Sequence, residues 1–112
     1  MEKPYILPRR ASIDKPLRIA VFISGNGSGL NALLNYQQTP RAHITKLIIS
    51  DNINAHGLKY GYDNNIKTKS IPLPDIFDKN RQRILHEGLI NIELINSKVE
   101  LIVLSGYMRI LT

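Results

Sequence analysis

The order of segments in residues 18–34 constrains the fold of this chain more than any other feature of its sequence. Residues 19–23 are all apolar and rich in Val and Ile, which is typical of a buried strand. The segment Ser24–Gly29 then supplies three glycines, and leucines follow at helical spacing (Leu30, Leu33 and Leu34). Strand, turn and helix form the first half of a βαβ unit, and the first amides of its helix lack intrahelical partners. This stretch therefore predicts a phosphate-type anion site at the turn.

Apolar runs and helical patterns alternate along the rest of the chain, which predicts an α/β fold. Strands are expected at residues 18–24, 43–50, 66–71 and 101–104, and helices at residues 28–36, 55–62 and 79–97. Right-handed crossovers then give a Rossmann-like parallel sheet with helices on both faces, and the strand order expected for this sheet is 3-2-1-4. Ligands of such sheets bind where the carboxyl ends of the first and fourth strands meet.

The helix boundaries and faces can also be predicted. Ser28 is expected to cap the first helix, and Asp78 is expected to cap the third. The third helix should bury one apolar face, whose members recur at three- and four-residue spacings: Ile84, Leu85, Leu89, Ile92 and Ile95.

Length and composition limit the class of protein. A chain of 112 residues fits one domain, in which residues 1–17, with three prolines, are expected to be an extended tail. It has no cysteine and no apolar run near the ~18 residues of a membrane span, so a cytoplasmic protein with no membrane partner is expected. The net charge of +6 comes without a dense Lys/Arg block, which argues against a nucleic-acid partner.

The residues of the turn leave several ligands open. A tight connection without a ligand is one alternative, and a non-catalytic interaction module is another. A dinucleotide site is a third, but Leu30 stands where the fingerprint that begins at Gly25 needs its last glycine. Asp51 ends the second expected strand, near the position of the ribose-binding acid; otherwise Asp51 should cap the following helix.

Three motifs together resemble a known family. They are ISGNGS at residues 23–28, AHGL at residues 55–58 and LSGYMRIL at residues 104–111. Their order closely resembles the N-terminal half of the phosphoribosylglycinamide formyltransferases over about residues 18–112, which implies a truncated formyltransferase fold. The resemblance implies transfer of a formyl group from 10-formyltetrahydrofolate to glycinamide ribonucleotide in purine biosynthesis. Formyltetrahydrofolate deformylase has a similar Tyr-Met-Arg segment without the glycine turn, and is the alternative.

The resemblance also implies roles for individual residues. Backbone amides of Gly27, Ser28 and Gly29 would hold the phosphate of the nucleotide; the family usually has Asn at position 29, so a side-chain contact is missing here. Arg81, with Arg83 as the alternative, would pair with an anionic part of the folate co-substrate. The folate pocket would be lined by Met108, Arg109, Ile110 and Leu111. No metal is implied.

The catalytic groups of the family are not expected in this chain. An Asn, a His and an Asp supply them, and all three lie beyond the point that matches Leu111, so they are expected beyond Thr112. The expectation is a truncated enzyme, inactive alone, whose residues 101–104 form an exposed sheet edge that can self-associate. The histidines have no partner at the spacing of a metal site or a catalytic triad, so none is assigned a role: His43, His56 and His86.

Overall fold

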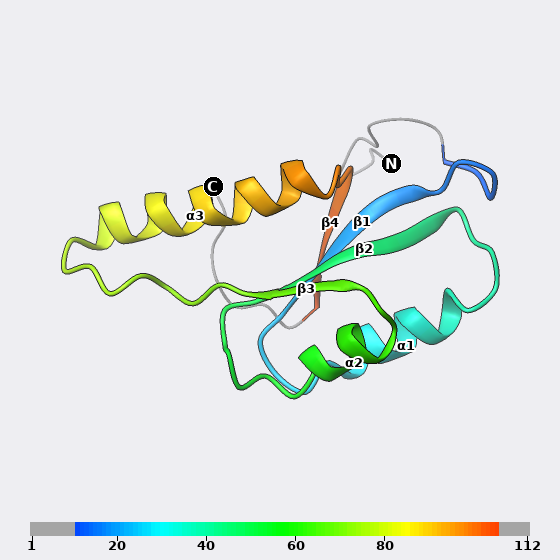
Figure 1. The fold of residues 1–112 in the computed structure, drawn as a ribbon, viewed down its shortest axis with the longest axis horizontal. Coiled ribbons are helices and arrows are strands. Elements are labelled where there is room, and N and C mark those ends of the chain that lie inside the picture. Colours follow the sequence, from blue (N-terminus) through cyan, green and yellow to red (C-terminus); the bar gives the residue numbers. More distant parts are fainter. Residues whose placement is uncertain (1–10, 106–112) are drawn as a thin grey trace, which may run out of the picture.

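A four-stranded parallel sheet forms the centre of the molecule in a computed structural model, which describes residues 11–105 (Figure 1). Its strand order is β3-β2-β1-β4, as predicted, and the α/β class is confirmed. The elements in chain order are β1 (Leu17–Ile23), α1 (Ser28–Tyr36), β2 (His43–Ser50), α2 (Leu58–Asp63), β3 (Lys67–Ser70), α3 (Lys79–Asn96) and β4 (Leu101–Ser105).

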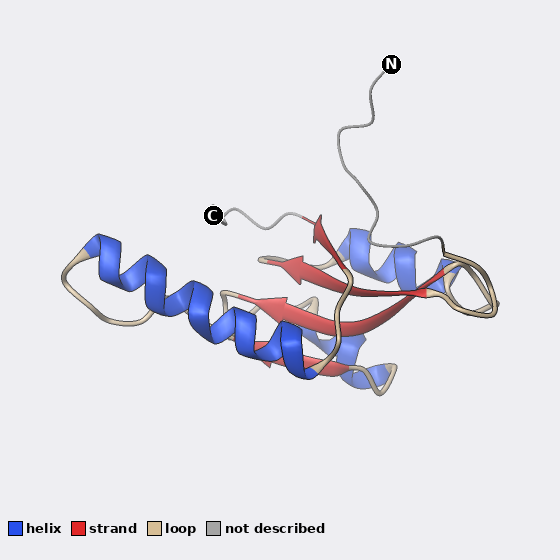
Figure 2. Ribbon diagram, turned by 90° about the horizontal axis from the view of Figure 1, so that it is seen from above, coloured by secondary structure: helices blue, strands red, loops and turns tan. Residues whose placement is uncertain are grey.

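Helices cover both faces of this sheet. Successive side chains of a strand point to opposite faces, and the central strands are buried at consecutive positions, so both faces must be covered. Figure 2 shows α3 on one face and the two shorter helices on the other. On the face of α1 and α2, the core includes Ile19 and Val21 of β1 with Leu30 of α1. On the opposite face, Phe22 packs with Ile90 of α3 in a second, smaller core.

The first two helices begin differently from the sequence prediction. The N-cap of α1 is Gly27 in the left-handed region (φ 75°), and Ser28 is already helical, so the prediction that Ser28 is the cap was wrong. The amide of Ser28 instead donates to Oδ1 of Asn26 (3.2 Å). The second helix begins at Leu58 rather than residue 55, because turns occupy the residues before it, where the Ala55 amide donates to the carbonyl of Asn52 (3.0 Å).

The start of α3 agrees with its prediction. Asp78 has extended backbone angles, and its carboxylate accepts from the amides of Asn80 (2.9 Å) and Arg81 (3.4 Å). The side chain therefore satisfies two of the amides that a helix start leaves without partners.

The face that α3 buries was predicted wrongly. The apolar residues expected in the core are 40–74% exposed: Ile84, Leu85, Leu89, Ile92 and Ile95. The helix instead turns His86 and Ile90 toward the sheet. Two polar contacts fix this rotation: Nε2 of His86 lies 2.7 Å from the carbonyl of Ile71, and Glu93 forms an ion pair with Lys67 of β3 (3.0 Å).

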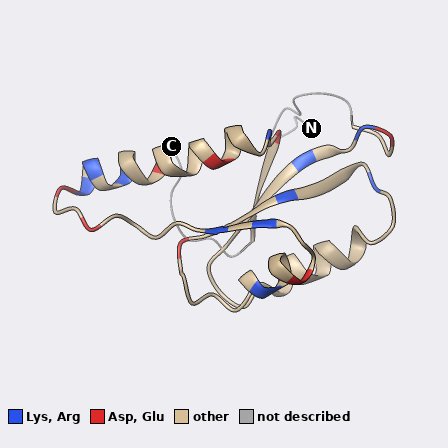
Figure 3. Cartoon of the chain, viewed as in Figure 1, with Lys and Arg blue, Asp and Glu red and all other residues tan. Residues whose placement is uncertain are grey.

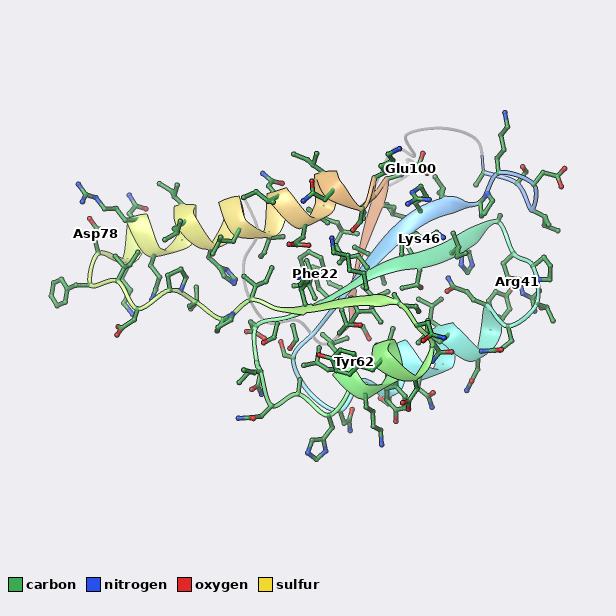
Figure 4. The ribbon with its side chains drawn as sticks, in the orientation of Figure 1. Phe22, Arg41, Lys46, Tyr62, Asp78 and Glu100 are labelled. Carbon is green, nitrogen blue, oxygen red and sulfur yellow. The ribbon has the colours of Figure 1, made fainter. Side chains whose placement is uncertain are left out.

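One irregularity interrupts the pairing of the two central strands. Ile19 pairs with Thr45 and the next residue, Ala20, pairs with Leu47, so Lys46 is an additional residue in β2. Such a bulge bends the strand locally and shifts its register. Figure 4 labels Lys46 on the central part of the sheet.

Candidate functional site

The glycine turn lies at the carboxyl end of β1 and leads directly into α1 (Figure 1). Its left-handed residue, Gly27, has a conformation that glycine adopts without steric cost. The carbonyl of Gly27 accepts the first helical bond, from the amide of Asn31 (2.8 Å). The turn thus reverses the chain in few residues and aims the start of α1 at the edge of the sheet.

Two amides in the first turn of α1 remain available to a ligand. The N-cap makes no side-chain hydrogen bond, and within residues 11–105 the amides of Gly29 and Leu30 donate to no acceptor. The third, that of Ser28, already donates to Asn26 in an exposed bond that an anion would displace. Such amides, together with the helix dipole, favour an anion.

The turn is held in place by the segment that precedes α2. The amide of Gly57 donates to the carbonyl of Gly25 (3.0 Å). Backbone also packs against backbone here, since a Cβ added at Gly57 would lie 2.8 Å from Cα of Gly27 and 2.7 Å from Cδ1 of Ile23. The motif around residues 55–58 supported the family resemblance, but no role for Gly57 could be predicted from it. The structure identifies Gly57 as the residue that allows two connections to meet.

A side-chain bond ties the ends of β1 and β2 together. The hydroxyl of Ser24 donates to Oδ1 of Asp51 (2.9 Å). The expectation that Asp51 caps the following helix was wrong, because the N-cap of α2 is Gly57 and no side chain caps it. Asp51 instead fixes the entrance to the glycine turn.

The end of β4 reaches the same place. A Cβ added at Gly29 would overlap Oγ of Ser105, so these two residues are direct neighbours. Since β4 pairs with β1, the carboxyl ends of both strands and the start of α1 meet at one edge. The expected ligand crevice lies at this edge, but sequence reasoning did not identify Ser105 as part of it.

The residues predicted to contact folate are not brought together within the described part of the chain. Arg81 lies in the first turn of α3, is 83% exposed, and has Nε 3.9 Å from Oδ2 of Asp78. Figure 4 labels Asp78 at the tip of the helix that projects beyond the sheet, away from the glycine turn. Arg83 is also exposed on α3. The predicted folate loop, residues 108–111, lies outside the described residues.

The prediction about the catalytic groups also concerns a region outside the described residues. These groups were expected beyond Thr112, and the structure describes the chain only as far as Ser105. Thr112 itself therefore lies outside the described residues, and the expected position of the catalytic groups stays a prediction.

Two of the three histidines have structural partners. Nδ1 of His43 lies 2.7 Å from Nε2 of Gln37, and His86 contacts a backbone carbonyl. No group of three metal-ligating side chains forms within residues 11–105.

None of the helices between those residues combines the length and apolarity needed to cross a bilayer. Figure 3 shows that the Lys and Arg residues are spread over α2, α3 and the strands.

A shallow groove lies along α2 and the connection that precedes this helix. It has a volume of about 460 Å³ and is lined by residues of the β2–α2 connection and of α2, among them Ile53, His56, Lys59 and Tyr62. Lys59 is the cation of this lining.

Comparison with known proteins gives one consistent result. The family described as "Formyl transferase" matches residues 17–112. A trifunctional purine biosynthetic protein adenosine-3 of Chironomus tentans is 35% identical over 105 residues, which cover 93% of this chain and 7% of that protein. A phosphoribosylglycinamide formyltransferase of Saccharomyces cerevisiae is 33% identical over 107 residues, covering 84% of this chain and 50% of the relative.

Solved structures agree with these sequence matches. A phosphoribosylglycinamide formyltransferase of Coxiella burnetii superposes with a TM-score of 0.76 at 34% identity, covering 87% of this chain and 44% of that one. The enzyme of the same name from Brucella melitensis gives 0.77 at 33% identity, covering 88% and 50%. The chain thus spans half or less of the length of each of these relatives.

Proposed function

This chain belongs to the formyl transferase family, and from that premise we propose that it provides the nucleotide-binding half of a phosphoribosylglycinamide formyltransferase. The reaction is transfer of a formyl group from 10-formyltetrahydrofolate to the amine of glycinamide ribonucleotide. The names of the relatives support the reaction class. The observation that carries the proposal is the turn at residues 25–29, where open amides meet the edge shared by β1 and β4.

We propose that different residues bind the two substrates. The backbone amides of Gly27, Ser28 and Gly29 hold the phosphate, which fixes the nucleotide at a distance from the reacting amine. Positioning of this kind lowers the entropic cost of a reaction between two substrates. The folate co-substrate is proposed to contact Arg81, with Arg83 as the alternative, and the loop at residues 108–111.

The bond-making step needs groups of another kind. As the amine attacks the formyl carbon, an oxyanion develops and a proton leaves the nitrogen, so a hydrogen-bond donor and a general base are required. We propose that these groups come from the part of the family's domain that this chain does not match. No metal is part of the proposal.

Self-association through β4 is proposed on separate evidence. The strand lies at the edge of the sheet, and on the side of α3 its residues Ile102 and Leu104 are 38% and 53% exposed. The opposite edge, β3, carries exposed Lys67 and Lys69, which discourage strand pairing. A cytoplasmic location stays a prediction.

The phosphate site can be tested by NMR on the ¹⁵N-labelled chain. Titration with glycinamide ribonucleotide should move the amide signals of Gly27, Ser28 and Gly29 first. Glycinamide riboside, which lacks the phosphate, is the matched control and should leave these three signals in place. Shifts confined to the surroundings of Asp51 on adding NAD would favour the dinucleotide alternative. No response of the turn to the nucleotide at millimolar concentration would refute the proposal.

A further inference from the structure

The contact between Gly29 and Ser105 carries an inference about the ligand site. Gly29 is the second residue of α1, and Ser105 is the last residue of β4. The hydroxyl oxygen of Ser105 occupies the space in which a Cβ of residue 29 would lie, while its own Cβ is 3.8 Å from that position. The hydroxyl thus stands beside the first turn of α1, whose Gly29 amide is open to a ligand.

The strand explains why this side chain points at the helix. Leu101 and Val103 pack against the core on the side of α1. Side chains of a strand alternate between faces, so Ser105 projects to the same side as those two residues. The first four residues of β4 are apolar, which makes Ser105 the polar side chain of this strand. It stands at the end where the ligands of such sheets bind.

We infer that Ser105 is a further binding residue of this site, with its hydroxyl donating to the phosphate oxygen that the amide of Gly29 also holds. This inference rests on the proposed function, because it assigns a contact to the phosphate of the nucleotide. A hydroxyl suits the task, since it donates to an oxyanion without adding charge. Only a glycine at position 29 leaves room for the hydroxyl in its present place. Residues 29 and 105 therefore act as a coupled pair.

The test is a double-mutant cycle read by calorimetric titration with glycinamide ribonucleotide. Ser105→Ala should weaken binding about 10-fold, the loss of one hydrogen bond to a charged group. Gly29→Ala should also weaken binding, because its methyl group displaces the hydroxyl. In a chain that already carries Ser105→Ala, the same methyl group meets no hydroxyl, so adding Gly29→Ala should cause no further loss.

Controls separate this inference from its premise. If the parent chain binds the nucleotide and its Ser105→Ala variant binds it equally tightly, the inference about Ser105 is overturned while the proposed function stands. A cycle in which the two losses simply add has the same consequence. Absence of nucleotide binding by the parent chain overturns the proposed function and the inference with it. Amide spectra of each variant establish that it is folded, and Ser105→Thr, which keeps the hydroxyl, should restore binding toward that of the parent.

Discussion

Replacing Gly57 by alanine tests whether backbone packing holds the glycine turn. Gly57 has right-handed helical angles (φ −62°, ψ −19°), so alanine fits its backbone conformation. Alanine would restrict the unfolded chain and so raise the free energy of unfolding by about 0.4–1 kcal/mol if there were room for the methyl group. There is not, since the added Cβ would lie 2.8 Å from Cα of Gly27.

The magnitude follows from the distance that must be gained. Ordinary contacts between carbon atoms begin at about 3.5 Å, so Gly27 must move about 0.7 Å away from Gly57. The obstacle is backbone, and the bond between the Gly57 amide and the Gly25 carbonyl resists the movement. Overpacking of this kind costs about 1–3 kcal/mol. We therefore expect Gly57→Ala to lower the free energy of unfolding by about 1–2 kcal/mol net.

A matched control makes the result decisive. Gly88 lies within α3, and a Cβ added there meets no atom within 4 Å. The same substitution at Gly88 should raise the free energy of unfolding by about 0.5–1 kcal/mol. Urea unfolding followed by circular dichroism measures the free energy of unfolding of both variants. The two values are compared when the slope of this free energy against urea concentration is the same for both variants. A Gly57→Ala variant as stable as Gly88→Ala would refute the packing argument.

Two further substitutions probe α3 by the same unfolding measurement. Asp78→Ala removes the cap of the helix and should cost about 1 kcal/mol, whereas Asp78→Asn keeps an acceptor and should cost less. Equal losses would show that the loss does not come from the hydrogen bonds that this side chain accepts. Ile90→Ala should cost about 3 kcal/mol because it opens a cavity under α3, while Ile95→Ala, 74% exposed, should stay within about 0.5 kcal/mol of the parent. The reverse order would mean that the helix buries the face predicted from the sequence.

Most of the fold was predictable because its signals are local. Residues 19–23 and the run that ends in Ser50 are too apolar and β-branched for surface segments, and turn-forming residues follow both of them: Gly25 after the first, Asp51 and Asn52 after the second. The handedness of βαβ connections leaves few strand orders, and 3-2-1-4 is the usual doubly wound order, so its prediction needed no knowledge of individual contacts. Asp78 could be identified as a cap because its partners are only two and three residues away.

The rotation of α3 could not be predicted, because two sides of this helix are apolar. The larger apolar stripe, which includes Ile84 and Ile92, outweighs Ile90 in any count of hydrophobic residues along the helix. The buried side is selected by His86 and Glu93, whose partners lie in and beyond β3. Polar contacts between distant segments carry no periodic signal in the sequence.

The candidate site divides in the same way. The turn at residues 25–29 is a local pattern, and its place at the carboxyl end of β1 followed from the sequence. The contact of Gly27 with Gly57 joins residues 30 positions apart, and that of Gly29 with Ser105 joins residues still more distant in the chain. Neither pair could be found until the fold brought them together.

The additional residue in β2 decides where this chain can change its length. Side chains alternate along a strand, so deleting one residue normally sends every later side chain to the opposite face. Deleting Lys46 would instead join Thr45, the partner of Ile19, to Leu47, the partner of Ala20, and leave both on their present faces. The same deletion at Ile48 would move Ile49 away from Ile90. Related proteins could therefore lose or gain a residue at position 46 without rebuilding the core. A deletion at a neighbouring position of β2 would instead move core side chains to the wrong face.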